Sequence, residues 1–166
     1  KTFDELGIVM DDEFYATFTG ASTKKVTQSL VDKYNLKITP EEIAKIKRTY
    51  FKDYFDNDPD FDLIPGVKDL IEHYFQNGIK LVLASSAHTN TINWVFEKFN
   101  LEPYFIGKIS GSTLKESKPN PEIFLIASEM SGEPVENCMV IEDSTNGIEA
   151  AKAASIFCAA YKSEHT

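Results

Sequence analysis

The stretch "CMVIEDSTNGIEAAKAASIFCAA", residues 138–160, decides the expected fold. Its first part, "CMVIE", predicts a strand, "NGIEAAKAA" predicts a helix, and "SIFCAA" predicts a second strand. A strand, a helix and another strand in this order form the repeating unit of a parallel sheet. The first strand ends on two adjacent carboxylates, Glu142 and Asp143, which repel each other unless a nearby positive charge offsets the repulsion.

The same alternation extends back to Leu63. "PGVKDLIEHYFQNG" predicts a helix that begins near Pro65 and ends at Gly78, where glycine provides the left-handed position after a helix. "IKLVLA" predicts a strand with apolar side chains on both faces, as in a covered parallel sheet. The remaining elements expected here are a helix over 89–99, a strand near 105–109 and a helix over 121–131. The sequence therefore predicts an α/β core over residues 63–166, a Rossmann-like parallel sheet with helices on both faces.

The sequence predicts a small all-helical cap domain over residues 1–62. The stretch "TPEEIAKIKRTYFKDYF" begins with Thr39 as the N-cap, Pro40 in the first turn and Glu42 completing a capping box. Apolar and aromatic residues recur at helical spacing and are expected to line one face of this helix, namely Ile43, Ile46, Tyr50, Phe51 and Tyr54. "STKKVTQSLVDKYN" predicts a second helix, with one side lined by Val26, Leu30 and Val31. We interpret both stripes as core and assign them no chemistry.

Composition excludes some classes of function. The chain has 166 residues and a net charge of −9, with its acidic residues spread along the sequence. Nucleic-acid binding relies on clustered basic residues and is not expected. No apolar run approaches the roughly 20 residues of a membrane span. The cysteines, Cys138 and Cys158, lie in apolar runs and are expected to be buried small side chains of a cytoplasmic protein. We expect a monomer that binds a small molecule.

Polar residues follow three of the predicted elements. Ligands of open α/β sheets bind beyond the carboxyl ends of the strands. Ser85 and Ser86 follow "LVLA" and lead into a helix, where hydroxyl groups and backbone N–H groups can cradle an anion. Lys118 lies in "LKESKPNPEIF", in a loop that Pro119 and Pro121 restrict. The alternatives are helix-capping serines and a solvated surface lysine.

The third strand end carries Glu142 and Asp143. Adjacent carboxylates suit a hard divalent cation such as Mg²⁺, which takes oxygen ligands and retains waters that a phosphate can replace. The alternative is a helix N-cap formed by Asp143 or Ser144. Taken together, the three strand ends hold hydroxyl donors, a lysine and paired carboxylates. These are the components that phosphoryl transfer requires.

The motifs resemble those of the haloacid-dehalogenase-like (HAD-like) superfamily. "LVLASS", "SKPNPEIF" and "VIEDSTNGIEAAKAA" match its second, third and fourth motifs in order and spacing, and the resemblance covers residues 1–160. The subgroup with a helical cap domain, which contains β-phosphoglucomutases and sugar-phosphate phosphatases, is the most similar. The resemblance implies Mg²⁺-dependent phosphoryl transfer through an aspartyl-phosphate. We expect the substrate to be a hexose phosphate.

The resemblance also implies roles for individual residues. Ser85 and the N–H of Ser86 would hold the transferring phosphoryl group. Lys118 would bridge the phosphate and the nucleophile. Asp143 would bind Mg²⁺ directly, with Glu142 beside it as a second ligand or as a partner of the ligands.

The first motif of the superfamily, Asp-x-Asp after an apolar strand, is not found in the sequence. Asp11 and Asp12 are adjacent, and no predicted strand precedes Asp56 and Asp58, so we interpret none of them as the nucleophile. The resemblance therefore implies that the sequence is an internal portion of a longer enzyme, with the first strand and a C-terminal strand outside it. This portion alone is expected to be inactive.

The stretch "FTGASTKKV" resembles the loop through which the cap domain meets the substrate. β-Phosphoglucomutases carry an arginine three residues after the glycine; here Gly20 is followed at that distance by Thr23. This departure weakens the case for a mutase and leaves a phosphatase open. A different class of function remains open, a non-catalytic binding or regulatory module that keeps the fold without the nucleophile. An Asp-x-Asp-Gly sequence shortly before Lys1 would support the enzyme, and its absence would support the non-catalytic module.

Overall fold

The computed structural model describes residues 1–18 and 20–162. Residues 163–166, which the sequence assigns to the core, lie outside the described residues. The chain divides into two compact units, one formed by Lys1–Phe18 and Thr23–Asp62, the other by Thr19–Ser22 and Leu63–Thr166. Among the described residues, no helix is long and apolar enough to cross a membrane.

The first unit is helical. It contains α1 (Thr2–Glu5), α2 (Asp12–Ala16), α3 (Thr23–Tyr34) and α4 (Pro40–Asn57). Its core is formed by Ile8, Leu30 and Ile43, with Val26 and Val31 packed around them as the helical spacing predicts. The prediction for the end of α4 is wrong by one residue. Tyr54 is 56% exposed whereas Phe55 is buried, because Phe55 packs against the ring of Phe61 at a centroid distance of 5.0 Å.

The capping box at the start of α4 is confirmed. The N–H of Glu42 donates to Oγ1 of Thr39 at 3.3 Å, and Oε2 of Glu42 accepts a hydrogen bond from the N–H of Thr39 at 2.9 Å. Each side chain thus satisfies a backbone donor that the first turn of the helix leaves without a partner.

Replacing Thr39 by alanine should lower the free energy of unfolding by about 1 kcal/mol, because one N–H at the helix start loses its acceptor. Urea titrations followed by circular dichroism measure this difference. Thr49→Ala, in the middle of the same helix, is the matched control. It should be neutral or slightly stabilising, since alanine has the higher helix propensity. Equal losses in both variants would contradict the role of the cap.

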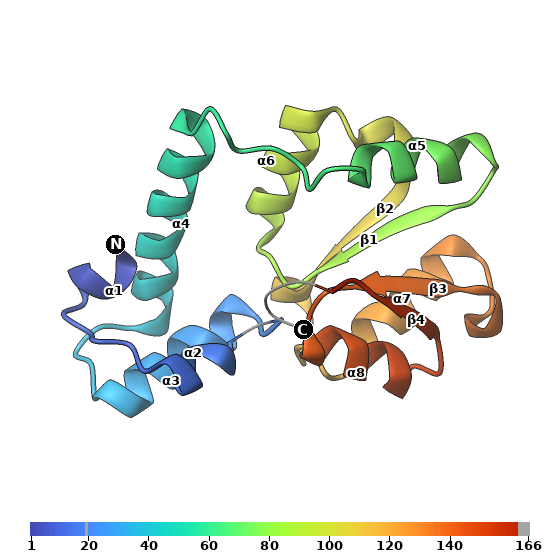
Figure 1. Cartoon of the computed structure of the whole chain (residues 1–166). Coiled ribbons are helices and arrows are strands. Elements are labelled where there is room, and N and C mark those ends of the chain that lie inside the picture. The colour runs from blue at the N-terminus through green and yellow to red at the C-terminus, as the bar shows by residue number, and fades with distance from the viewer. Residues whose placement is uncertain (19, 163–166) are drawn as a thin grey trace. The chain divides into compact units, whose positions relative to one another are not determined.

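The second unit alternates helices and strands in the predicted order. Its elements are α5 (Val67–Gln76), β1 (Leu81–Ser85), α6 (Thr89–Phe99), β2 (Phe105–Ser110), α7 (Glu122–Ser131), β3 (Met139–Glu142), α8 (Thr145–Ala153) and β4 (Phe157–Ala160). Short 3₁₀ helices lie at Glu102–Tyr104, Gly111–Thr113 and Val135–Asn137. The parallel strands and intervening helices confirm the α/β class (Figure 1).

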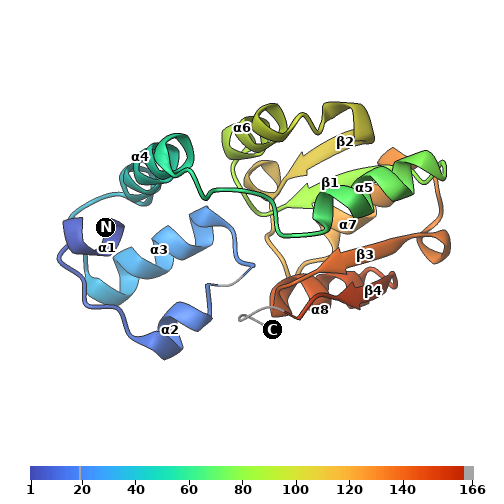
Figure 2. The same cartoon turned by 45° about the horizontal axis from the view of Figure 1, so that its top comes forward.

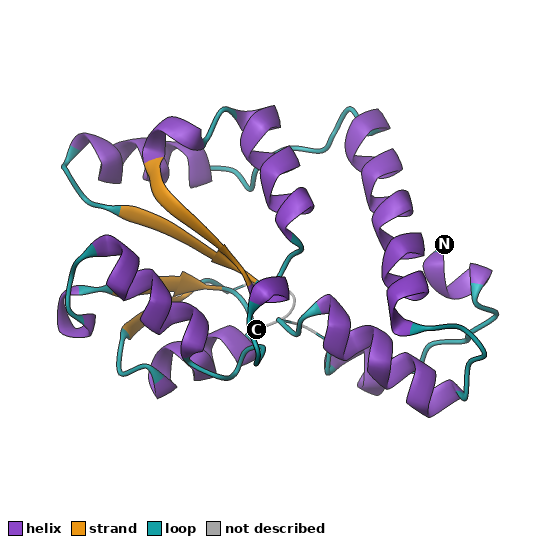
Figure 3. Ribbon diagram, turned by 180° about the vertical axis from the view of Figure 1, so that it is seen from behind, coloured by secondary structure: helices purple, strands orange, loops and turns teal. Residues whose placement is uncertain are grey.

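The strands form two parallel pairs. β1 pairs with β2, where Ser85 faces Ser110, and β3 pairs with β4, where Glu142 faces Ala160. Within the described residues these are two separate two-stranded sheets, which Figure 3 shows as two pairs of orange arrows. The parallel pairing agrees with the predicted α/β class, and no backbone ladder among the described residues joins the two pairs. Side-chain packing joins the two pairs instead.

A shared apolar cluster accounts for this joining. Its buried members come from β2, α7, α8 and the segment before β4, and they are Ile109, Ile123, Phe124, Ala150, Ala151, Ala154 and Ile156. Val82 and Ala84 of β1 and Val140 of β3 pack against the same cluster. Both strand pairs therefore rest on α7 and α8, although they share no ladder of hydrogen bonds.

The two pairs differ in how their other faces are covered. Leu83 of β1 packs into a second cluster with Ile92 and Phe96 of α6, so helices lie on both sides of β1 and β2 (Figure 2). On the other pair, Met139 and Phe157 face each other and are 47% and 71% exposed. The prediction of covered faces thus holds for β1 and β2 and not, within the described residues, for β3 and β4.

The cysteines are less buried than the sequence predicts. Cys138 and Cys158 are half-buried free thiols. The sulfur of Cys138 lies 3.4 Å from the carbonyl oxygen of Pro134, within reach of a weak hydrogen bond. Cys158 lies on the edge of the apolar cluster, and burial raises the pKa of its thiol. Both act as small packing residues at the border of the core.

Candidate functional site

Lys118 is a buried cation at the carboxyl ends of the strands. Only 5% of its side chain is exposed, and its ammonium donates to the carbonyl oxygen of Ala84 at 3.2 Å and to Oε2 of Glu142 at 2.7 Å. The ammonium also lies 4.7 Å from the centre of the Phe124 ring. These contacts exclude a solvated surface lysine. Since Ala84 belongs to β1 and Glu142 to β3, one charge links the two strand pairs.

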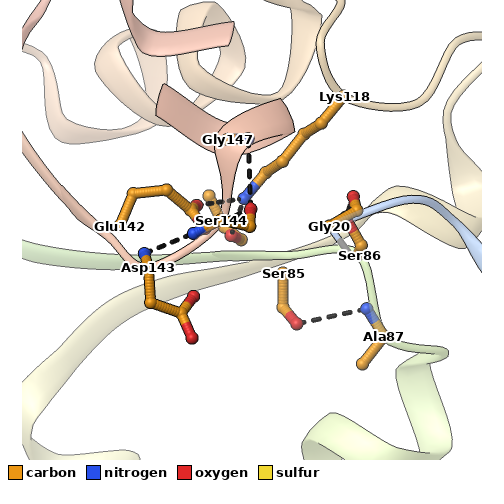
Figure 4. A network of polar contacts seen from close by, with 10 residues as sticks. Gly20, Ser85, Ser86, Ala87, Lys118, Glu142, Asp143, Ser144 and Gly147 are labelled. Atoms are coloured by element: carbon orange, nitrogen blue, oxygen red, sulfur yellow. Dashed lines mark hydrogen bonds and ion pairs between the residues drawn. The ribbon is translucent and has the colours of Figure 1, made fainter. Parts of the chain in front are cut away.

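Glu142 is held by donors on both carboxylate oxygens. Oε2 accepts from Lys118, and Oε1 accepts from the hydroxyl of Ser144 at 2.7 Å and from the N–H of Ser144 at 3.1 Å (Figure 4). Burial by itself raises the pKa of Glu142, but the charge of Lys118 and these hydrogen bonds outweigh it and lower the pKa overall. Glu142 therefore remains ionised and fixes the position of the lysine.

The adjacent carboxylates point apart. Figure 4 shows the carboxylate of Asp143 directed away from the Glu142–Lys118 pair. Asp143 is exposed, whereas the side chain of Glu142 is 10% exposed. The positive charge that offsets the repulsion is therefore the ammonium of Lys118, which the sequence placed in a different motif. Both oxygens of Glu142 are already paired with protein donors, which leaves Asp143 as the carboxylate directed elsewhere.

The N-cap of α8 is Ser144. Its Oγ accepts a hydrogen bond from the N–H of Gly147 at 3.1 Å while its proton goes to Glu142. Of the two caps that the sequence left open, Asp143 and Ser144, the structure selects Ser144. The start of α8 therefore does not depend on the side chain of Asp143.

A glycine at position 147 is required by Glu142. A Cβ atom added to Gly147 would lie 2.0 Å from Cδ of Glu142 and 2.3 Å from its Oε2. Such distances are far below van der Waals contact, so one group would have to move. The carboxylate cannot move without losing the hydrogen bonds of Lys118 and Ser144.

Gly147→Ala is expected to lower the free energy of unfolding by about 1–3 kcal/mol through overpacking, which outweighs the gain of up to about 1 kcal/mol in helix propensity. Thermal unfolding of the parent and the variant measures the change. In a Glu142→Ala background the same substitution should be neutral or stabilising, because the clashing carboxylate is gone. A loss that persists in that background would show that Glu142 is not the cause.

The serines after β1 have separate contacts. Oγ of Ser85 accepts a hydrogen bond from the N–H of Ala87 at 3.1 Å, and the hydroxyl of Ser86 donates to the carbonyl oxygen of Gly20 at 2.9 Å. Neither caps α6, because that helix begins at Thr89 and its N-cap is His88, whose Nδ1 accepts from the N–H of Asn90. The capping alternative for the serines is therefore wrong. Ser85 directly follows Ala84, whose carbonyl oxygen accepts a hydrogen bond from Lys118.

Gly20 and Thr23 fall in different units. Gly20 belongs to the same unit as Ser86 and adopts a positive φ of 74°. Thr23 begins α3 in the helical unit, where its Oγ1 accepts a hydrogen bond from the ammonium of Lys47 at 3.3 Å. No local sequence pattern indicates Lys47 as the partner of Thr23, because Lys47 lies 24 residues further along the chain, in α4.

The acidic residues that were set aside as nucleophiles have structural contacts. Asp11 caps α2, where its Oδ1 accepts from the N–H groups of Glu13 and Phe14. Asp56 forms an ion pair with Lys52 one turn away in α4. Asp58 is the C-cap of α4. Asp11 and Asp58 thus lie at helix ends, and Asp56 takes part in an ion pair within α4.

The comparison with protein families decides the classification. The description "haloacid dehalogenase-like hydrolase" belongs to a family whose profile matches residues 7–155. The chain belongs to this family. Its description names the haloacid-dehalogenase-like group that the three strand-end motifs resemble, so the motifs and the profile agree.

Proteins similar to this chain include named phosphatases and mutases. Phosphoglycolate phosphatase 1 from Pseudomonas aeruginosa is 30% identical over 123 residues, which cover 74% of this chain and 45% of that protein. A β-phosphoglucomutase structure from Clostridium difficile has a TM-score of 0.84 and 27% identity, covering 98% and 74% of the two chains. A variant of CbbY from Rhodobacter sphaeroides, in complex with xylulose-(1,5)bisphosphate, has a TM-score of 0.83 and 26% identity, covering 99% and 77%.

The chain is shorter than these relatives. It spans from 15% to 61% of the length of the first curated proteins that it matches.

The residues fit part of a site for Mg²⁺. A hard cation prefers carboxylate oxygens, and Asp143 directs one exposed carboxylate away from the ion pair. Over residues 1–18 and 20–162, however, no group of three or more His, Cys, Asp or Glu side chains is arranged to hold a metal ion. Asp143 can thus supply one ligand, and Glu142 is better placed as the partner of Lys118.

Proposed function

We propose that the protein containing this chain transfers the phosphoryl group of a small phosphorylated metabolite. The observation that carries the proposal is the buried ammonium of Lys118, held between the ends of β1 and β3 by Ala84 and Glu142. A buried charge is costly unless it is paired, and an enzyme gains from one that is already fixed where negative charge develops. The names of the relatives, phosphatases and phosphoglucomutases, support the same chemistry.

Each strand-end residue has a distinct task in this proposal. The hydroxyl of Ser85 and the N–H of Ser86 bind phosphoryl oxygens, since a serine hydroxyl that accepts one hydrogen bond can still donate its own proton. Two N–H groups of the Lys118 ammonium donate to Ala84 and Glu142, and the third donates to a phosphoryl oxygen beside the attacking group, where the positive charge neutralises charge that grows in the transition state. Glu142 keeps the ammonium in place, so that little reorganisation is needed at each turnover.

Asp143 would bind Mg²⁺ in this proposal. When bound, the metal supplies a positive charge that polarises the phosphoryl oxygens and helps to neutralise the charge of the phosphate. Asp143 suits this task because Ser144, and not Asp143, caps α8. The carboxylate is therefore not needed for the start of the helix.

The substrate that we propose is a hexose phosphate, and the route is an aspartyl-phosphate intermediate. No residue within 1–18 or 20–162 is assigned here as the nucleophile. Transfer to water would make the enzyme a phosphatase, and transfer to a sugar hydroxyl would make it a mutase. Thr23 in place of an arginine weakens the case for the mutase.

The test is a screen of the full-length protein for phosphate release and for isomer formation across hexose and other sugar phosphates. Each substrate is assayed with Mg²⁺, with EDTA, and with and without a sugar bisphosphate primer. Phosphate release that EDTA abolishes supports the phosphatase, and primer-dependent isomerisation supports the mutase. Binding of sugar phosphates without any turnover would instead favour the non-catalytic module.

A further inference from the structure

The hydroxyl of Ser86 has a partner that the proposed reaction does not explain. It donates to the carbonyl oxygen of Gly20 at 2.9 Å, across 66 residues of sequence. Phosphate binding as proposed uses only the backbone N–H of Ser86. The side chain is therefore engaged with Gly20, which Figure 4 shows beside Ser86. Gly20 begins segment 20–22, which belongs to the same compact unit as Ser86.

Segment 20–22 also lies close against Ser144. A Cβ atom at Gly20 would be 2.4 Å from Oγ of Ser144, 2.9 Å from its Cβ and 3.1 Å from Cβ of Asn146. Gly20 has a φ of +74°, a conformation that L-residues with side chains rarely adopt. Glycine is thus required twice at this position, once for the backbone conformation and once for the close approach.

These contacts connect the segment to the buried ion pair. Ser144 donates its proton to Oε1 of Glu142, and Oε2 of Glu142 accepts from Lys118. Ser22, at the other end of the segment, is 7% exposed. The segment therefore meets the residue after β1 through Ser86 and the residues after β3 through Ser144, at the rim formed by both strand pairs.

We propose that Ser86 is a positioning residue whose hydroxyl latches segment 20–22 onto this rim, against the Ser144 side chain that holds Glu142. The two adjacent serines then have different roles. The hydroxyl of Ser85 binds the ligand, and the hydroxyl of Ser86 holds the segment. The assignment of Ser85 rests on the proposed function. The latch itself rests only on the contacts of Gly20, Ser86 and Ser144.

Hydrogen–deuterium exchange of the full-length protein without substrate tests the latch. In Ser86→Ala the peptide containing residues 20–22 should exchange about fivefold faster, the factor that corresponds to one lost hydrogen bond of about 1 kcal/mol. Ser86→Thr retains the hydroxyl and should restore slow exchange. Gly20→Ala should accelerate exchange of the same peptide by at least as much, because its Cβ cannot fit against Ser144.

Ser131→Ala is the matched control. It removes a hydroxyl that donates to the carbonyl oxygen of Ser128 at 2.7 Å, and it should leave the peptide of residues 20–22 unchanged. Unchanged exchange of that peptide in Ser86→Ala would overturn the latch, as would an equal acceleration in the peptides of α7, which would indicate general destabilisation. Because no phosphoryl transfer is measured, this result is independent of whether the proposed activity is found.

Discussion

Replacement of Lys118 by methionine is expected to lower kcat/KM by at least a hundredfold, which corresponds to about 3 kcal/mol of transition-state stabilisation. Methionine keeps much of the apolar stem and removes the ammonium that Ala84 and Glu142 hold in place. Lys118→Arg should restore activity only in part, because a planar guanidinium does not fit where a compact ammonium was bound. Steady-state kinetics of the full-length variants on a sugar phosphate measure both effects.

The effect of Lys118→Met on turnover must be separated from its effect on stability. Lys118→Met leaves the carboxylate of Glu142 nearly buried without its counter-charge, at a cost of about 3 kcal/mol in the free energy of unfolding. The double variant Lys118→Met/Glu142→Gln removes both charges and should recover most of this stability without recovering turnover. Lys115→Met, an exposed lysine in the same loop, should match the parent in both measurements. Parent-like turnover in a folded Lys118→Met variant would refute the phosphoryl-transfer role of this loop.

Asp143→Asn is expected to reduce turnover at sub-millimolar Mg²⁺ by about a hundredfold or more, roughly 3 kcal/mol, because a neutral amide is a poorer ligand for a hard cation than a carboxylate. Stability should change little, since Ser144 supplies the N-cap of α8 and Asp143 is exposed. Activity measured against Mg²⁺ concentration should show a higher requirement for the metal. Isothermal titration with Mg²⁺ provides a second readout that does not depend on substrate.

The control for this variant is Asp69→Asn, an exposed aspartate in the first turn of α5. It makes the same change of charge away from the strand ends and should leave the metal dependence of the parent. If Asp143→Asn and the parent respond identically to Mg²⁺, Asp143 does not bind the metal. A comparable loss in both variants would point to net charge as the cause.

Local sequence patterns were sufficient for the elements and for the order of the motifs. The helix over 89–99 and the capping box of Thr39 and Glu42 follow from signals contained within a few residues, and the structure has both. Alternation of helix and strand after Leu63 predicts the parallel α/β class for the same reason. These features depend on spacing, caps and apolar runs, all of which act over one or two turns of chain.

Contacts between distant residues were beyond the reach of sequence patterns. The sequence placed Glu142 and Asp143 together as a metal pair, and only the folded chain shows that Glu142 faces Lys118, 24 residues away, while Asp143 points elsewhere. The bond from Ser86 to Gly20 likewise has no local signature. Adjacent residues on a strand end point in different directions, and which neighbour each one meets depends on how the strands, loops and α8 pack. The sequence therefore determined which chemical groups lie at the strand ends, and tertiary packing decided which partner each group contacts.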